Sequence, residues 1–359
     1  MKILILGANG FIGSNLCYRL LKDTEHKVVA VDMKDDNYSL IKSINDEERF
    51  IDYKFDVFNA ICRKGSGAFV INKLFDECDL VINLIAIATP DLYIKRPIRV
   101  FELDFELAFA VLKKCFFYKK KLLFPSTSEI YGMNENTPFE EDISYRVLGP
   151  TKNQRWIYSS CKALAEHLMH AFGDRGLDYV IVRFFNMIGP RLDRLDSIHQ
   201  SGARVIIHFM NALINNENIK LVNGGLQTRS FCYIRDGIDC LLSIIEKFDD
   251  VRGMTFNIGN GDPACELSMM ELAIKMTKIY NELTGSNIQN NLEAIKGHDF
   301  YGKGYQDTQK RVPSVQRAKY ILGYEPKVDI DEALRRTIHY FLLEERIIDK
   351  PLISTTEEL

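Results

Sequence analysis

Two side chains with the spacing of a proton-transfer pair, Tyr158 and Lys162, stand near the middle of the chain. Residues four positions apart lie on the same face of a helix. An ammonium group beside a phenol favours the phenolate and lowers the pKa of the phenol. Tyr158 could then take a proton from a substrate hydroxyl while a hydride leaves the same carbon. Such a pair is common in proteins, so its meaning depends on the motifs around it.

A polar segment that begins at Ser126 follows the apolar run Leu122–Phe124. In an open α/β sheet, ligands bind outside the carboxyl ends of the strands. Thr127 is therefore expected to share the hydrogen bond of the substrate hydroxyl with Tyr158. Taken in isolation, the same segment could equally be a polar loop.

A glycine-rich segment follows the first apolar run, Ile3–Leu6, and precedes a helical pattern from Phe11 to Leu21. Glycines permit a tight turn and let the backbone approach a pyrophosphate, which the amides of a helix N-terminus bind. The spacing is GxxGxxG rather than GxGxxG, and a plain turn between strand and helix is the alternative. We predict a dinucleotide site whose contacts include Gly7, Asn9, Gly10, Phe11, Ile12 and Gly13.

The acidic partner of this loop is Asp32, which ends the second apolar run 22 residues after Gly10. A carboxylate at this point accepts hydrogen bonds from the ribose hydroxyls of NAD and repels the 2′-phosphate of NADP. The sequence therefore predicts NAD, although Lys34 leaves NADP open. Asp56 could bind the adenine amine or, equally, cap a helix. The other candidates for cofactor contacts are Ile85, Ala86, Tyr158 and Lys162.

Apolar runs alternate with helical patterns over the first half of the chain, including helical segments expected at 98–117 and 155–172. This alternation predicts an α/β fold, a Rossmann-type doubly wound parallel sheet covered by helices on both faces. We expect an NAD-binding domain over 1–190, to which some later segments return. A smaller substrate-binding lobe is expected mainly over 191–350, followed by a polar tail at 351–359.

Composition excludes several classes of function. The formal net charge of −3 does not favour a nucleic-acid partner. No stretch approaches the ~18 apolar residues of a membrane span. The eight cysteines form no CxxC pair and no zinc-like cluster with histidine, so no metal site is expected. Unpaired cysteines of this kind are typical of a reducing compartment, and we expect a cytoplasmic protein.

In this order, the glycine loop, Asp32, Thr127, Tyr158 and Lys162 resemble the extended short-chain dehydrogenase/reductase family, of NAD-dependent epimerase/dehydratase type. The chain is most similar to the UDP-glucuronic acid decarboxylases, above all to the decarboxylase half of the bifunctional polymyxin-resistance proteins. The resemblance extends from Met1 to about Pro351. It is carried by segments 86–90, 99–106, 124–133, 155–158 and 301–307.

This resemblance implies roles for residues that spacing alone does not identify. It places Ser128, Glu129 and Arg311 with Thr127, Tyr158 and Lys162 in the reaction, and it gives substrate contacts to Tyr93, Asn186, Arg204, Lys220, Arg229 and Tyr305. It also implies a UDP-linked sugar substrate and a homodimer formed through the helices at 98–117 and 155–172, for which core packing is the alternative. Two departures affect substrate identity: 183–187 reads RFFNM where the family has RPFNW, and Asn223 replaces a usual Asp.

The pair Ser128–Glu129 favours one reaction among relatives of this type. Sugar 4,6-dehydratases carry Asp-Glu at these positions because a leaving hydroxyl needs an acid, and the hydroxyl of Ser128 is far too weak an acid. We therefore expect oxidation at C4 followed by decarboxylation of UDP-glucuronate, giving a UDP-4-keto-pentose or UDP-xylose. A 4,6-dehydratase, a 4-epimerase and a non-catalytic NAD sensor or scaffold are the alternatives.

Overall fold

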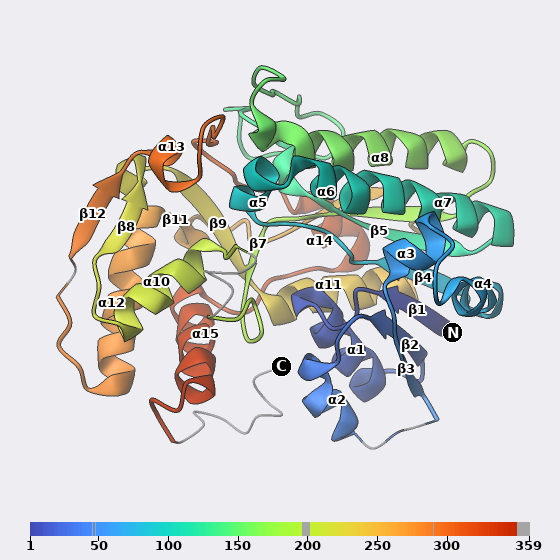
Figure 1. Cartoon of the computed structure of the whole chain (residues 1–359), viewed down its shortest axis with the longest axis horizontal. Helices are drawn as coiled ribbons and strands as arrows, with labels where there is room; N and C mark the ends of the chain where they lie inside the picture. Colours follow the sequence, from blue (N-terminus) through green and yellow to red (C-terminus); the bar gives the residue numbers. More distant parts are fainter. Residues whose placement is uncertain (45, 47, 196–201, 290, 350–359) are drawn as a thin grey trace.

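The larger of two lobes is built around a parallel sheet, to which the N-terminal half of the chain contributes most of the strands (Figure 1). The structure, a computed structural model, describes residues 1–44, 46, 48–195, 202–289 and 291–349. The sheet has seven parallel strands in the order β3-β2-β1-β4-β5-β6-β10. The strands are β1 (Lys2–Leu6), β2 (Lys27–Asp32), β3 (Phe50–Lys54), β4 (Leu80–Asn83), β5 (Lys121–Thr127), β6 (Tyr179–Phe184) and β10 (Thr255–Ile258). The predicted α/β Rossmann-type fold is confirmed.

Helices cover both faces of this sheet, which explains why its inner strands are almost entirely apolar. Side chains alternate along β1: Ile3 and Ile5 join the core on one face, and Leu4 and Leu6 join the core on the other. One face packs against α1 (Phe11–Asp23) and α11 (Ile234–Glu246). The other packs against α3 (Val57–Cys62), α4 (Ala68–Glu77), α7 (Leu107–Tyr118) and α8 (Ile157–Gly173). The shorter helices of this lobe are α2 (Ser39–Lys42), α5 (Pro90–Lys95), α6 (Pro97–Phe101) and α14 (Gln316–Leu322).

The smaller lobe lies beside the carboxyl ends of the strands, on the left in Figure 1. It contains a three-stranded sheet, β11-β9-β7, and a two-stranded sheet, β12-β8. Its strands are β7 (Asn186–Ile188), β8 (Ile219–Val222), β9 (Thr228–Tyr233), β11 (Glu266–Ser268) and β12 (Leu292–Ile295). Its helices are α10 (Val205–Ile214), α12 (Met269–Thr284), α13 (Gly297–Phe300) and α15 (Ile330–Glu344). Among the residues described, no helix is both long and apolar enough to cross a membrane.

The helix expected at 98–117 is interrupted. A π-helical turn at Glu102–Glu106 separates α6 from α7, and the N–H of Leu107 bonds the carbonyl of Glu102 five residues earlier. The helix expected from Arg155 begins at Ile157, after a 3₁₀ turn at Gln154–Trp156. The apolar periodicity of both segments is unbroken, so the sequence pattern did not predict the π-helical turn or the 3₁₀ turn. Both irregular turns lie beside the cavity described below.

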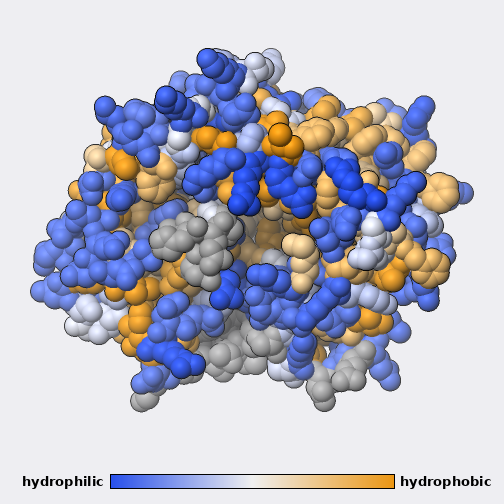
Figure 2. Space-filling model, in the orientation of Figure 1, coloured by the Kyte–Doolittle hydropathy of each residue, from blue (hydrophilic) through white to orange (hydrophobic). Residues whose placement is uncertain are grey.

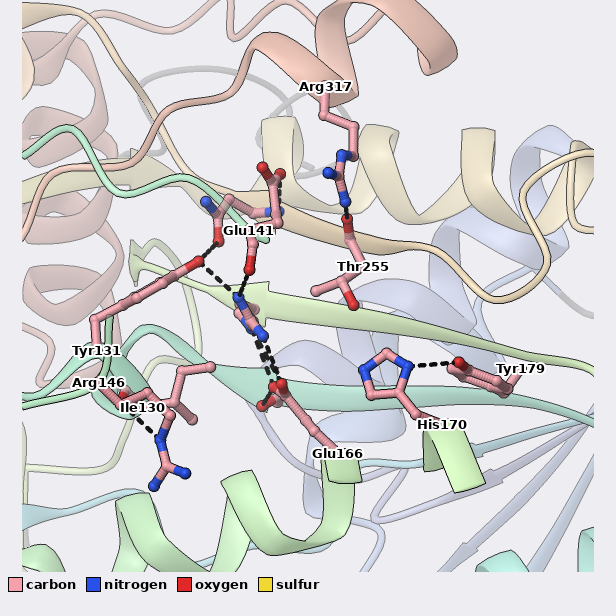
Figure 3. A network of polar contacts seen from close by, with 12 residues as sticks. Ile130, Tyr131, Glu141, Arg146, Glu166, His170, Tyr179, Thr255 and Arg317 are labelled. Atoms are coloured by element: carbon pink, nitrogen blue, oxygen red, sulfur yellow. Dashed lines mark hydrogen bonds and ion pairs between the residues drawn. The ribbon is translucent and has the colours of Figure 1, made fainter. Parts of the chain in front are cut away.

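A buried polar network ties α8 to the sheet and to the segment after β5 (Figure 3). The Nη2 atom of Arg183, on β6, lies 2.6 Å from Oε2 of Glu166, on α8. The Nη1 atom donates to the hydroxyl of Tyr131 at 2.8 Å and to the carbonyl of Glu141 at 2.7 Å. Ser126 also donates to the Glu166 carboxylate. Because α8 carries Tyr158 and Lys162, this network fixes the helix on which the proton-transfer pair stands.

The Glu166→Gln substitution should destabilise the protein by about 3–5 kcal/mol, because it leaves the buried guanidinium of Arg183 without a counter-charge. Urea unfolding measures the change. The matched control is Glu325→Gln, which removes an exposed partner of Lys319 and should cost no more than about 1 kcal/mol. Equal unfolding midpoints for the two variants would contradict the structural role of the buried pair.

Candidate active site

A cavity of about 1290 Å³ lies between the lobes, at the carboxyl ends of β1, β4, β5 and β6. In Figure 2 the surface is hollowed near the middle of the view. Predicted site residues that lie far apart in the sequence come together on the wall of this cavity. The predicted catalytic and substrate-side residues that line it are Thr127, Ser128, Glu129, Tyr158, Lys162, Arg311, Tyr93, Asn186, Arg204, Lys220, Arg229 and Tyr305.

The glycine loop forms the end of the cavity at β1. Gly7 has φ +82°, a conformation that favours glycine, and a Cβ on Gly13 would stand 2.5 Å from the carbonyl oxygen of Gly7. Helix α1 begins at Phe11, so the unpaired amides of its first turn lie at this end. Gly7, Gly10, Phe11, Ile12 and Gly13 all line the cavity. Cβ atoms added at Gly7 and Gly13 would meet the chain's own backbone and displace this turn, whose amides fit the pyrophosphate of a dinucleotide.

Asp32 stands where β2 ends, and two backbone amides orient its carboxylate. It accepts hydrogen bonds from the N–H of Asn9 at 3.0 Å and of Met33 at 2.7 Å. Burial raises its pKa, and these hydrogen bonds oppose the rise. Asp36 and Asn37, which the sequence reasoning missed, line the cavity a few residues further on. Their position just after the acidic partner was the signal that could have identified them.

Four predicted cofactor residues do not line the cavity in the described part of the chain: Asn9, Asp32, Asp56 and Ile85. Asn9 and Asp32 form the layer behind the loop through their mutual hydrogen bond. Asp56 caps α3 by accepting the N–H of Asn59 at 3.0 Å, which is the alternative that its sequence position left open. Ile85 lies next to Ala86, which does line the cavity. The contact of Asp56 with adenine stays a prediction.

The predicted proton-transfer pair occupies the centre of the cavity. Tyr158 is buried with its ring stacked on that of Tyr93, the ring centroids 4.7 Å apart, and it shares a hydrogen bond with Thr127. Lys162 lies on the same face of α8, with Nζ 5.9 Å from the centre of the Tyr158 ring. Its ammonium donates to the carbonyl of Pro125 at 3.1 Å and lies 3.5 Å from a carboxylate oxygen of Asp104.

The expectation that Lys162 lowers the pKa of Tyr158 needs correction. Burial raises the pKa of Tyr158, the negative charge of Asp104 raises it further, and the Thr127 hydrogen bond only partly opposes these effects. The charge of Lys162 is shared with Asp104, whose own pKa burial raises to about 6. In the protein alone Tyr158 is therefore a neutral phenol, and a further positive charge in the cavity is needed to favour the phenolate.

Glu129 lies on a short 3₁₀ turn directly after β5, between two buried guanidinium groups. Its Oε2 is 2.6 Å from Nη2 of Arg155, and its Oε1 is 2.9 Å from Nη1 of Arg311. Burial alone would raise the pKa of Glu129, but Arg155 and Arg311 outweigh it and hold the pKa at about 2. Glu129 is thus a carboxylate at neutral pH. The hydroxyl of Thr127 accepts a hydrogen bond from the backbone N–H of Glu129 at 3.1 Å, which links Thr127 to Glu129.

Two predicted substrate-side cations are paired with acids on the cavity wall. Arg229 lies 2.6 Å from Asp307, and its Nη1 also donates to the carbonyl of Thr308. Arg204 lies 2.7 Å from Asp193. A diphosphate would therefore meet arginines that are already held in place.

The remaining substrate-side residues lie on the smaller lobe or at its edge. Lys220 is exposed on β8, Asn186 donates to the carbonyl of Ser230 at 2.9 Å, and Tyr305 stacks on Tyr301 with ring centroids 4.3 Å apart. Asn223, the departure from the usual Asp, accepts the N–H of Gly297 at 2.9 Å. Its amide therefore joins β8 to the start of α13, a role that an Asp side chain could also fill.

Sequence reasoning missed two charged residues at the site: Arg155, which lines the cavity, and Asp104, which is fully buried behind Lys162. Arg155 precedes Tyr158 by three residues, about one helical turn, and this spacing was an available signal. Asp104 reaches Lys162 from the π-helical turn, and nothing in the alternation of acidic and apolar residues at 102–106 distinguished it from its neighbours. π-helical turns occur frequently at functional sites.

Comparisons with known proteins agree with this fold. The model of the "NAD dependent epimerase/dehydratase family" matches residues 3–259. The crystal structure of PbgP3 protein from Burkholderia pseudomallei is 34% identical, with a TM-score of 0.82 over 97% of this chain and 99% of that chain. A UDP-glucuronic acid 4-epimerase from Bacillus cereus, in complex with UDP-glucuronic acid and NAD, is 23% identical, with a TM-score of 0.77 over 96% of this chain and 100% of that chain. A dTDP-glucose 4,6-dehydratase from Bacillus anthracis, in complex with NAD, is 20% identical, with a TM-score of 0.74 over 97% and 98%.

The Asp32→Ala substitution should narrow the preference for NAD over NADP. The wild-type carboxylate accepts from the ribose hydroxyls and repels a 2′-phosphate, and alanine does neither. Dissociation constants for both dinucleotides, measured by titration calorimetry, test this. Asp52→Ala on β3 is the control, because that carboxylate is exposed and does not line the cavity. Equal affinity of the wild-type protein for NAD and NADP would refute the role given to Asp32.

Proposed function

The chain belongs to the NAD-dependent epimerase/dehydratase family, whose cofactor is NAD, and we propose that it oxidatively decarboxylates a UDP-linked hexuronic acid, UDP-glucuronate. The product is a UDP-4-keto-pentose or, if the hydride returns to the sugar, UDP-xylose. A nucleotide-sugar substrate is supported by the UDP-glucuronic acid bound to the Bacillus cereus 4-epimerase, which shares the fold. The proposal assigns the reaction to the cavity between the lobes.

The observation that carries the proposal is the state of Ser128 and Glu129. A dehydratase needs an acid at the first of these positions, and a serine hydroxyl cannot serve. The second, Glu129, is held ionised between Arg155 and Arg311, so at neutral pH it has no proton to give to a leaving hydroxyl. The same guanidinium groups suit a substrate that carries a carboxylate next to the reacting carbon.

Oxidation at C4 comes first. Tyr158 accepts the proton of the C4 hydroxyl as the hydride leaves C4, and Thr127 orients that hydroxyl through its hydrogen bond with Tyr158. NAD held by the glycine loop would take up the hydride, and the positive charge of its nicotinamide would favour the phenolate of Tyr158. Lys162 contributes the nearest fixed ammonium, held by the carbonyl of Pro125 and by Asp104.

Loss of CO₂ follows from the ketone. The C6 carboxylate is then β to the C4 carbonyl, so the C5–C6 bond breaks and its electron pair enters the enolate of C4 and C5. Tyr158, which has gained the C4 proton, can support the enolate oxygen by a hydrogen bond. Because Glu129 stays ionised, the proton that C5 gains comes from Tyr158 or from solvent. Glu129 and Arg311 position the substrate rather than donate protons.

The proposal is tested by mass analysis of the nucleotide sugar and by CO₂ release with UDP-glucuronate and NAD. We expect loss of CO₂, and a roughly 100-fold fall in its rate in Glu129→Gln and Arg311→Ala with near-normal NAD binding. Arg335→Ala is the control, because it removes an arginine on α15 that pairs with Glu282, away from the cavity. A product lighter by one water would indicate a dehydratase, and a C4 epimer of unchanged mass would indicate an epimerase. No reaction with NAD bound would favour a sensor or scaffold.

We further propose that two copies pair through the predicted segments 98–117, which spans α6 and α7, and 155–172, which contains α8; α6 and α8 lie side by side (Figure 1). Ile98 on α6 is 76% exposed and Leu164 on α8 is 47% exposed, although both are apolar. The Leu164→Asp variant should sediment as a monomer because it places a charge in the interface. Phe69→Asp, at a still more exposed apolar residue on α4, should leave a dimer intact. A wild-type monomer at micromolar concentration would exclude this pairing.

A further inference from the structure

We propose that Asn257 is a positioning residue for the reaction, because its side chain holds both Glu129 and Arg311 in the geometry of their ion pair. Asn257 lies on β10, the edge strand of the seven-stranded sheet, and is fully buried. It is not among the described residues that line the cavity, so it acts on the substrate only through other residues. The inference rests on the proposed function, because it concerns the charged pair that the reaction requires.

The side chain of Asn257 uses both of its donors and its acceptor on three other segments of the chain. Its Oδ1 atom accepts a hydrogen bond from the hydroxyl of Tyr131 at 2.8 Å. Its Nδ2 atom donates to the carbonyl of Phe139 at 2.9 Å and to that of Ser314 at 3.3 Å. Because carbonyls can only accept, they determine which end of the amide faces them. A buried amide is costly unless it is paired in this way, so core packing alone does not explain an asparagine here.

Asn257 points away from the apolar core on which its own strand packs. Phe256 and Ile258, on either side of it, belong to the core that contains α1 and α11. Side chains alternate along a strand, so Asn257 faces the opposite side of the sheet. Its register partner on β6 is Arg183, which donates to the same Tyr131 hydroxyl at 2.8 Å. The hydroxyl of Tyr131 is therefore held by two neighbouring strands (Figure 3).

The hydrogen bond to Tyr131 reaches Glu129 through one short turn. Both residues belong to the 3₁₀ turn Ser128–Tyr131, of which Tyr131 is the last residue. Tyr131 is buried, and its ring stacks on that of Phe139 with the ring centroids 4.5 Å apart. With its ring packed and its hydroxyl bonded, Tyr131 cannot shift without moving the turn. The carboxylate of Glu129 is therefore held in place from the C-terminal end of this turn.

The two hydrogen bonds from Nδ2 of Asn257 reach Arg311 through a second segment. The N–H of Phe139 donates to the carbonyl of Val312, and the N–H of Ser314 donates to the carbonyl of Phe139, both at 2.8 Å. Asn257 reinforces this bridge by bonding the carbonyls of Phe139 and Ser314. Arg311 directly precedes Val312, so the bridge holds the backbone from which its side chain extends. One amide thus supports the backbone on both sides of the ion pair.

This support matters because Glu129 has two cationic partners. Its Oε2 atom lies 2.6 Å from Arg155, and its Oε1 atom lies 2.9 Å from Arg311. If the segment of Arg311 shifted, Glu129 could stay paired with Arg155 alone, and the arrangement that meets the substrate would be lost. Displacements of about 1 Å are enough to slow a reaction severely. Asn257 opposes this displacement from outside the cavity.

A double-mutant cycle in the intact protein tests this inference. The rate of CO₂ release is measured at saturating UDP-glucuronate and NAD, so that it does not depend on the affinity for either. Asn257→Leu, which has a similar shape but no amide, should lower this rate by about 10-fold. In the Arg311→Ala background the same change should lower the rate by less than about twofold, because the pair that Asn257 positions is already absent. A purely structural role would give the same fold-change in both backgrounds.

Thr277→Val is the matched control. Thr277 is buried on α12 and donates to the carbonyl of Ala273 at 2.9 Å. It is not among the described residues that line the cavity. Losing this buried hydrogen bond should lower the midpoint of urea unfolding and leave the rate unchanged in both backgrounds.

The outcomes separate the two proposals. Equal losses from Asn257→Leu in the two backgrounds would refute the positioning role and leave the proposed function standing. If the wild-type protein releases no CO₂, both are refuted. Should Asn257→Leu fail to bind NAD, Tyr131→Phe replaces it, because it removes one hydroxyl and keeps the ring that stacks on Phe139. Its expected loss is about threefold in the protein that retains Arg311, and an equal loss in Arg311→Ala would refute the role of Asn257.

Discussion

The carboxylate of Glu129, buried between Arg155 and Arg311, connects the parts of the chain on which the active site depends. The three residues come from three segments: Glu129 from the turn after β5, Arg155 from the turn before α8, and Arg311 from the segment that runs beside β9. Burial of three charges is costly and is offset only when each is paired in good geometry. The cluster is therefore complete only when these three segments pack together, and all three residues line the cavity between the lobes.

Two buried acidic residues, Glu129 on the cavity wall and Asp104 behind it, have different pKa values because their charged neighbours differ. Glu129 faces two cations and keeps a pKa of about 2, whereas Asp104 faces one ammonium at 3.5 Å, and burial raises its pKa to about 6. Glu129 is therefore a fixed negative charge at any physiological pH. Asp104 titrates close to the physiological pH range, and its negative charge offsets the positive charge of Lys162 beside Tyr158. The readiness of Tyr158 to accept a proton therefore depends on Asp104 as well as on Lys162.

The sequence was most informative where chemistry depends on local spacing. Gly7, Gly10 and Gly13 meet steric requirements of one turn, and Tyr158 and Lys162 share a helix face through their separation alone. The parallel sheet followed from apolar strands that both cores require. Arg155 and Asp104 escaped prediction because their roles arise from partners far along the chain. The spacing of Tyr158 and Lys162 predicted a lowered pKa for Tyr158, whereas burial raises it. Burial depends on the folded structure and is not visible in the spacing.

The π-helical turn at Glu102–Glu106 shows why such partners are hard to predict. A helix must present one face to the sheet, where Leu107, Val111 and Cys115 pack, and the residues before it must also deliver Asp104 to Lys162. The wider π-helical turn rotates the residues before it relative to those after it, so both requirements are met, although its hydrogen bonds are less regular. The apolar residues on either side of the π-helical turn keep ordinary helical spacing. The sequence pattern therefore predicts which residues pack against the sheet, but it gives no sign that the helix changes register. The irregular turn is explained by the charge it positions, which only the folded structure reveals.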